Sequence, residues 1–280
     1  MVKAPRDSHL VYDSALRGDI AIEEIREVFN FRHLIWQLIR RDILTRYKRS
    51  FLGIAWTMLN PLGMMIVWTI AFSQLFKGSS LPAYPAFTLN GLLAWTFFSQ
   101  TTTAAMVNLV WGGNLLNRVY MPRSSFALAA MGTGMVNLLL SLIPLLLIML
   151  INGLPLTWNL LFVPIPILIL TAFSLGLGLI MSTFAVYFPD VSEMYQIIMQ
   201  AWMFLTPIMY PETVLPEEYR NIVTMFNPMY HLVKLFRIPL YYGRLPTTFE
   251  LLTPLTISIV VLIVGWIMFT RKSDEFSYRI

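Results

Sequence analysis

The sequence predicts an all-α membrane protein that crosses the bilayer six times. Of its 280 residues, 57% are hydrophobic and 12% are charged, which is too apolar a composition for a soluble domain of this size. Between residues 50 and 280 the chain alternates six long apolar segments with short charged patches. Because lipid offers the backbone no hydrogen-bond partners, an apolar run of roughly 20 residues is stable in a membrane only as a helix.

These segments divide the chain into four parts. A polar extension covers residues 1–30, and an amphipathic helix covers residues 31–53. The transmembrane domain follows at residues 54–270, and residues 271–280 form a tail. Within the transmembrane domain the expected spans are residues 54–76, 86–111, 126–151, 159–187, 194–210 and 253–269.

The distribution of positive charge predicts the orientation of the chain. Six crossings place both termini on one side of the membrane, and fifteen of the twenty Lys and Arg residues lie on that side. Loops rich in Lys and Arg are retained in the cytoplasm. We therefore expect a multi-pass protein of the cytoplasmic membrane with both termini in the cytoplasm.

Residues 31–53 are expected to form a helix that lies along the cytoplasmic surface of the membrane. Ile35, Ile39 and Ile43 recur every four residues and so share one face of a helix. The segment also carries five cations: Arg40, Arg41, Arg46, Lys48 and Arg49. Arg40, Arg41 and Lys48 fall largely on the opposite, basic face of the helix, whereas Arg46 projects toward the apolar face. Two interpretations stay open. The cations anchor the helix to anionic lipid, at about 1 kcal/mol each, or they form an entrance collar for an anionic lipid headgroup.

Two cytoplasmic turns have features of protein-binding sites. The first covers residues 114–123, and it holds aromatic, Met and Arg side chains, which are enriched at interfaces. Its expected contact residues are Asn117, Arg118, Val119, Tyr120, Met121, Pro122 and Arg123. The alternative for this turn is an ordinary interfacial loop. The second turn carries Phe188, Pro189 and Asp190, and capping of the next helix by Asp190 also explains it.

Residues 211–242 contain too few consecutive apolar residues to span the membrane. Two short amphipathic pieces, residues 214–226 and 229–242, are punctuated by prolines. We expect them to dip into or lie on the outer leaflet between the fifth and sixth spans. Irregular backbone is tolerated at that depth where it lines a cavity.

Aromatic residues gather in the first two spans. Trp68, Phe72, Trp95 and Phe98 belong either to an aromatic belt at the membrane interface or to a translocation path in which aromatic rings stack against sugar rings. The sequence leaves both interpretations open.

The sequence also disfavours several kinds of chemistry. No Asp, Glu, Lys, Arg or His lies well inside an expected span, whereas proton-coupled transporters carry ionisable groups there. The chain has no cysteine, and His231 is expected to make an interfacial polar contact rather than to bind a metal. The phosphate loop Gly-x-x-x-x-Gly-Lys-Ser/Thr is missing. We therefore expect no catalytic residue, metal or cofactor on this chain, and an energy source on another polypeptide.

Residues 41–62, RDILTRYKRSFLGIAWTMLNPL, resemble the opening of the membrane subunit of polysaccharide-exporting ABC transporters, the permeases for O-antigen, capsule and wall teichoic acid. The likeness covers nearly the whole chain beyond residue 30. It continues, in the order that the family shows, through residues 84–95, 117–122, 187–191, 206–211 and 227–228. One departure is Pro189, which stands where the family often has Arg, so an ionic role at this position is in doubt.

The resemblance implies a permease subunit rather than an enzyme. It would work as a homodimer in the bacterial inner membrane, with two ABC nucleotide-binding subunits that carry ATP and Mg. Residues 32–53 would be the cytoplasmic gate helix, residues 114–123 the coupling helix, and residues 214–242 the short helices that cap the exit.

The cargo implied by the resemblance is a lipid-linked polysaccharide, and nucleic acid is not an expected partner. O-antigen is expected first, with capsule or teichoic acid as alternatives. The phosphate of the cargo would meet the five cations of residues 31–53, and its sugars would pass Trp68, Phe72, Trp95 and Phe98.

Two other classes stay open on the residues alone. A membrane-embedded glycosyl or acyl transferase needs a catalytic carboxylate or His near one interface, and Asp190 with Glu193 is the acidic pair that it would use. A channel needs no nucleotide-binding partner, but it does not account for the first cytoplasmic turn.

Overall fold

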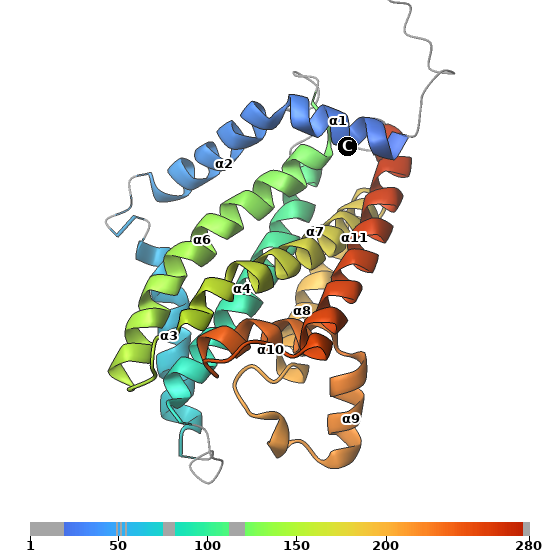
Figure 1. The fold of residues 1–280 in the computed structure, drawn as a ribbon. Coiled ribbons are helices and arrows are strands. Elements are labelled where there is room, and N and C mark those ends of the chain that lie inside the picture. The colour runs from blue at the N-terminus through green and yellow to red at the C-terminus, as the bar shows by residue number, and fades with distance from the viewer. Residues whose placement is uncertain are drawn as a thin grey trace, which may run out of the picture.

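The computed structural model describes residues 20–48, 50, 52–53, 55–74, 82–111 and 121–276. Every regular element in these ranges is a helix, so the all-α prediction is confirmed there (Figure 1). The long helices are α1 Ile20–Asn30, α2 Arg32–Tyr47, α3 Ala55–Phe72, α4 Tyr84–Trp111, α6 Ser124–Ile151, α7 Pro164–Tyr187, α8 Val191–Leu205, α9 Glu217–Phe226, α10 Pro228–Leu240 and α11 Thr248–Phe276. Two short 3-10 helices, η2 Trp158–Phe162 and η3 Glu212–Val214, lie between them.

Four of the described helical stretches are long and apolar enough to cross a membrane. They are Ala55–Phe72, Ser124–Ile151, Trp158–Tyr187 and Thr248–Ser273, which contain α3, α6, α7 and α11. Large apolar side chains on these helices point outward, and Ile70, Leu147 and Val260 are each more than half exposed. Such a surface suits a helix that is solvated by hydrocarbon, because lipid tails are as apolar as these side chains.

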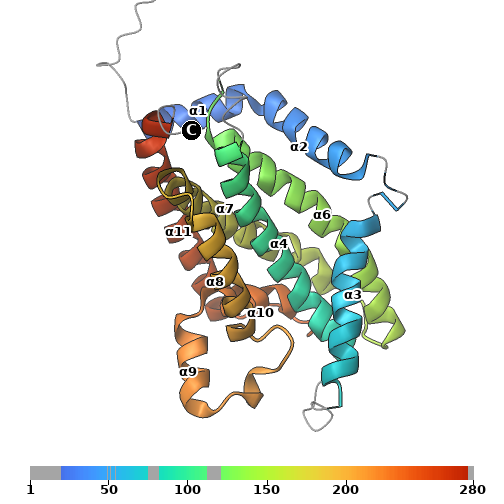
Figure 2. The same cartoon turned by 180° about the vertical axis from the view of Figure 1, so that it is seen from behind.

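Helix α4 lies at the centre of the bundle, where it packs against α3, α6, α7, α8 and α10 (Figure 2). It buries polar side chains, including Thr101 and Thr102. A buried hydroxyl needs a hydrogen-bond partner. Thr101 donates to the carbonyl of Phe97 at 2.7 Å, and Thr102 donates to that of Phe98 at 2.8 Å. Because the helix satisfies its own hydroxyls, α4 can be buried although it is more polar than the four apolar helices.

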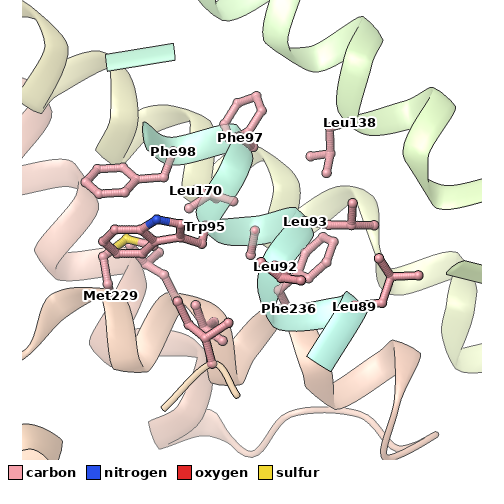
Figure 3. Packing of buried hydrophobic residues seen from close by; sticks show 14 of the residues in the cluster. Leu89, Leu92, Leu93, Trp95, Phe97, Phe98, Leu138, Leu170, Met229 and Phe236 are labelled. Carbon is pink, nitrogen blue, oxygen red and sulfur yellow. The ribbon is translucent and has the colours of Figure 1, made fainter. Parts of the chain in front are cut away.

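The main hydrophobic core forms where α4 meets α7 and α10 (Figure 3). Trp95 and Phe98 of α4 lie beside Leu170 of α7 and Met229 of α10. Phe98, Leu170 and Met229 have no exposed surface. This core fixes α10 to the bundle, so α10 is a buried helix.

Helices α7 and α11 approach closely through two glycines. A Cβ atom on Gly176 would lie 2.6 Å from the backbone of Leu262. One on Gly265 would lie 2.2 Å from the carbonyl oxygen of Gly176. Small residues allow such contact between membrane helices, which gain stability mainly from packing.

Helices α1 and α2 lie across one end of the bundle (Figure 1). Leu38 and Ile39 of α2 are buried against Ala129 of α6, with Ile35 and Ile43 partly buried beside them. The apolar face that the sequence predicts for this helix thus packs on protein. Its basic face stays exposed.

The segment between α8 and α11 lies at the opposite end (Figure 2). Helix α8 ends at Leu205, and Asn227 fixes the start of α10 by accepting a hydrogen bond from the Met229 N–H at 3.0 Å. The same side-chain oxygen accepts from Trp202 Nε1 at 2.9 Å, and the side-chain amide donates to Thr206 Oγ1 at 3.0 Å. One residue therefore connects the end of α8 to the start of α10.

Candidate functional site

The basic face of α2 borders a concave surface. Arg40, Arg41 and Lys48 are exposed and line a pocket of about 680 Å³ together with Gln37, Ile43, Leu44 and Thr45. Arg41 also pairs with Asp42 at 3.0 Å. The side chain of Arg46 and the whole of Arg49 lie outside the described residues. Three of the five predicted cations therefore share one surface that can bind an anion.

The four aromatic residues of the expected sugar path belong to the hydrophobic core. Trp95 and Phe98 are at most 5% exposed, Trp68 is also buried, and Phe72 is partly buried against the same core. Trp95 and Phe98 pack edge-on against Trp202 of α8, with ring centroids 6.2 Å and 5.4 Å away. A role in stacking against sugars stays a prediction for these four residues.

Trp202 is a residue that the sequence analysis did not single out, and it joins α8 to α4. Tyr195, on the same face of α8, donates to Thr102 Oγ1 at 2.7 Å. The spacing of Tyr195, Met199, Trp202 and Thr206 follows one face of a helix, and all four lie toward the bundle. This helical spacing is the sequence signal that could have identified Trp202 as a residue facing the bundle.

The first turn, residues 114–123, is only partly described. Asn117, Arg118, Val119 and Tyr120 lie outside the described residues. Met121 and Pro122 are buried at the start of α6, and the guanidinium of Arg123 lies 6.0 Å from the ring of Phe276.

The second turn is fully described and exposed. Phe188, Pro189 and Asp190 all present their side chains to the surface, with Phe188 63% exposed. The Asp190 side chain makes no capping hydrogen bond to α8, whose first turn bonds to backbone carbonyls instead. An exposed Phe at a turn is a suitable contact for a protein partner.

Helix α11 connects the two turns. The Tyr187 hydroxyl at the end of α7 donates to the Glu275 carboxylate, and the Tyr187 ring packs edge-on against Phe276 at 6.5 Å. Since Arg123 also lies over Phe276, the C-terminal end of α11 contacts the last residue of the first turn and the residue before the second turn.

Comparison with known proteins identifies the family of the chain. Residues 33–241 match the family described as ABC-2 type transporter. The O-antigen export system permease protein RfbA of Myxococcus xanthus is 30% identical over 260 residues, which cover 92% of this chain and 100% of the relative. RfbA of Klebsiella pneumoniae is 23% identical over 90% of this chain and 98% of its own length.

A third relative is the polysialic acid transport protein KpsM of Escherichia coli, which is 23% identical over 85% of this chain and 92% of its own length. The matched family region begins in α2 and ends just after α10, so it includes residues 114–123 and the Phe188 turn. The chain belongs to the ABC-2 type transporter family.

Proposed function

We propose that this chain is the permease subunit of an ATP-driven exporter that carries a lipid-linked polysaccharide across the bacterial inner membrane. The observation that carries the proposal is the match to an O-antigen export permease over that relative's whole length. O-antigen is therefore the first cargo to test. The likeness to a polysialic acid transport protein favours capsule polysaccharide as the second.

In this proposal six helices cross the membrane: α3, α4, α6, α7, α8 and α11. Four of them have the length and hydropathy for it. Helix α4 has 28 residues, or about 42 Å of helix, and is polar because the protein surrounds it. Helix α8 has 15 residues and crosses together with the non-helical residues that follow it. Both chain ends lie in the cytoplasm, and α9 and α10 lie toward the outer face.

Two copies of the chain form the working permease. Helices α3, α4 and α8 share one face of the protomer (Figure 2). Helices α3 and α8 carry exposed apolar side chains, such as Val67 and Ile197, which are more than half exposed. Pairing of these faces in a homodimer would bury them and leave the translocation path between the two protomers.

The energy comes from two ABC nucleotide-binding subunits that bind ATP and Mg. Residues 114–123 and the exposed Phe188 turn form the surface that they contact. Binding of ATP draws the two ATPases together. If the closed and open states of the permease bind the ATPases with different affinity, this movement shifts the permease from one state to the other. In this proposal the α11 contacts with Tyr187 and Arg123 couple the two turns.

The cargo enters at the basic surface of α2. Arg40, Arg41 and Lys48 meet the phosphate groups of the lipid carrier, because Arg and Lys are the side chains that bind phosphate. Arg46 and Arg49 lie on either side of Lys48 in the sequence and add to the positive charge of this segment. The lipid tails stay in the cytoplasmic leaflet beside α2.

The test is co-purification from membranes. The tagged chain is expressed with its candidate ABC ATPase, and we expect the ATPase to be recovered with it. Tyr120→Ala combined with Arg123→Glu should release the ATPase, whereas Tyr219→Ala, an exposed residue of α9 at the other end, should retain it. Deletion of the permease should abolish polysaccharide at the cell surface. Full surface polysaccharide in the deletion strain, or recovery of the folded chain without ATPase, would refute the proposal.

A further inference from the structure

Two adjoining cavities form one groove between α2, α3, α4 and α6. Their volumes are about 320 and 390 Å³, and Gln100, Gly134 and Asn137 border both. Along α4 the lining residues run from Leu93 to Asn108, which corresponds to about 22 Å of helix. Figure 2 shows α4 crossing this region, with α2 beyond one end, α3 beside it and α6 behind.

Carboxamides and hydroxyls line the groove together with apolar side chains such as Trp56, Phe97 and Leu138. Its four carboxamides are Asn60 of α3, Gln100 and Asn108 of α4, and Asn137 of α6. Among the described residues no Lys, Arg or His lines either cavity, and the one carboxylate is Asp42, which pairs with Arg41. The groove therefore presents almost uncharged polar groups among apolar side chains, in contrast to the basic surface on the same α2 helix.

None of the four carboxamides makes a side-chain hydrogen bond within the part of the chain that the structure describes. The hydroxyl of Thr133, which borders the same groove, is buried without a partner. Unpaired polar groups are costly at membrane depth, so these groups need water or a ligand. A primary amide offers two donors and one acceptor, which matches sugar hydroxyls, since each of these both donates and accepts.

The groove and the aromatic core occupy different faces of α4. Thr96, Gln100 and Asn108 line the groove, whereas Trp95 and Phe98 point toward Trp202 of α8 and are closed off by it. The open volume of both cavities lies on the groove face of α4. It also approaches α2 at Asp42 and Thr45, near the basic surface that is proposed to receive the cargo.

We propose that this carboxamide groove holds the uncharged sugar units of a hydroxyl-rich glycan, while the phosphate of the lipid carrier stays at the basic surface of α2. The inference rests on the proposed export function and deepens it. It assigns sugar contact to Asn60, Gln100, Asn108 and Asn137, which hydrogen-bond through their side-chain amides.

The absence of native cysteine makes a direct test practical. Asn137→Cys places a single thiol in the groove. Leu139→Cys places one two residues further along α6, about 200° around the helix, where the native side chain is 50% exposed on the outer surface. Open membrane fragments are treated with a membrane-impermeant maleimide. A thiol reacts as its thiolate, which forms where water reaches it.

The membranes come from cells whose glycan synthesis is blocked and from cells that make the glycan. In the first, the thiol from Asn137→Cys should be labelled several-fold faster than that from Leu139→Cys. In the second, labelling at position 137 should slow, because glycan occupies the groove. Equal labelling of the two positions, or no labelling at position 137, would show a dry groove filled by lipid or by the second copy. Fast labelling that glycan leaves unaltered would show water alone. Either result overturns the assignment.

Export by variants separates this inference from the proposed function. Gln100→Leu combined with Asn137→Leu should lower surface glycan several-fold while the ATPase still co-purifies. Asn137→Gln, which keeps a carboxamide, should retain more export than Asn137→Leu. Undiminished export by the double variant would overturn the inference and leave the proposed function standing. If the wild-type chain supports no export, the proposed function fails, and labelling in glycan-free membranes still reports whether the groove is hydrated.

Discussion

The Glu24 carboxylate of α1 caps helix α6 by accepting hydrogen bonds from both the backbone N–H and the hydroxyl of Ser124, at 3.2 Å and 2.6 Å. The first N–H groups of a helix lack partners within the helix, and a negative charge there is favourable. Helix α1 is held in place in turn by Trp266 of α11, whose Nε1 donates to the carbonyl of Ala21 at 3.1 Å. The N-terminal extension therefore fixes the start of α6, directly after the segment proposed to contact the ATPase.

Glu24→Ala should destabilise the first turn of helix α6. Loss of an N-cap interaction costs about 1 kcal/mol, so the backbone amides at the first turn of α6 should exchange with deuterium roughly fivefold faster. Mass spectrometry of the purified chain measures this exchange. Arg26→Ala, an exposed change on the same helix, serves as the control. Unaltered exchange at residues 124–127 in the Glu24→Ala variant would contradict the capping role.

Arg237 holds three segments together from a fully enclosed position. Its guanidinium donates to the carbonyls of Pro207 and Ile208, both at 2.6 Å, and lies 3.8 Å from the ring centroid of Phe87. Gly91 leaves the space for it, since a Cβ there would lie 2.3 Å from Arg237 Nη2. Within the described residues no carboxylate pairs with Arg237, so backbone carbonyls compensate its burial.

Arg237→Met should therefore lower the free energy of unfolding by about 3 kcal/mol, because two buried carbonyls lose their donor. Thermal unfolding of the detergent-purified chain measures the loss. Lys234→Met, on the same helix but with its side chain 35% exposed, should change stability by less than about 1 kcal/mol. Equal stability losses in the two variants would show that the carbonyl contacts of Arg237 are dispensable.

Arg237 also shows where prediction from sequence reached its limit. By sequence it counts among the five Lys and Arg residues outside the expected spans on the outer side. Pro207 and Pro211 indicate that a helix ends in this segment. Nothing in a linear pattern reveals that the carbonyls of Pro207 and Ile208 turn toward Arg237 of α10. The long apolar helices, in contrast, follow from composition, because each needs only its own run of apolar residues.

The residues of the candidate site also differ in how far the sequence could predict them. Exposed cations such as Arg40 and Arg41 could be found from charge alone, since a solvated charge depends little on its neighbours. The enclosed positions of Trp95 and Phe98 depend on Trp202, which lies about a hundred residues away in the sequence. The carboxamide groove requires three helices to be placed together before Asn60, Gln100 and Asn137 can be seen as one surface.

The close approach of α7 and α11 should make Gly265 intolerant of any side chain. Gly265→Ala places a methyl group 2.2 Å from the Gly176 carbonyl oxygen, which is backbone and cannot move aside. Overpacking of this kind costs about 1–3 kcal/mol. Gly63→Ala in α3 is a matched control, since nothing lies within 4 Å of the added carbon.

Gly63→Ala should be neutral or stabilising by about 0.5–1 kcal/mol, because Ala favours a helix over Gly. The yield of monodisperse protein and its unfolding temperature compare the two variants. If Gly265→Ala were as stable as Gly63→Ala, the two helices would have to lie further apart than the structure places them.

The basic surface of α2 should matter for transport and not for assembly. Arg40→Glu combined with Lys48→Glu reverses two exposed charges on one pocket. Repulsion of an anionic cargo should lower surface polysaccharide several-fold, while the level of the chain and its co-purification with the ATPase stay unaltered. Arg271→Glu, which is exposed near the C-terminal end of α11, controls for loss of positive charge at the same end of the molecule. Because anchoring to anionic lipid is the competing role of these cations, the double variant is also assayed for membrane extraction by alkaline carbonate. Full export by the double variant would remove the surface from the transport path.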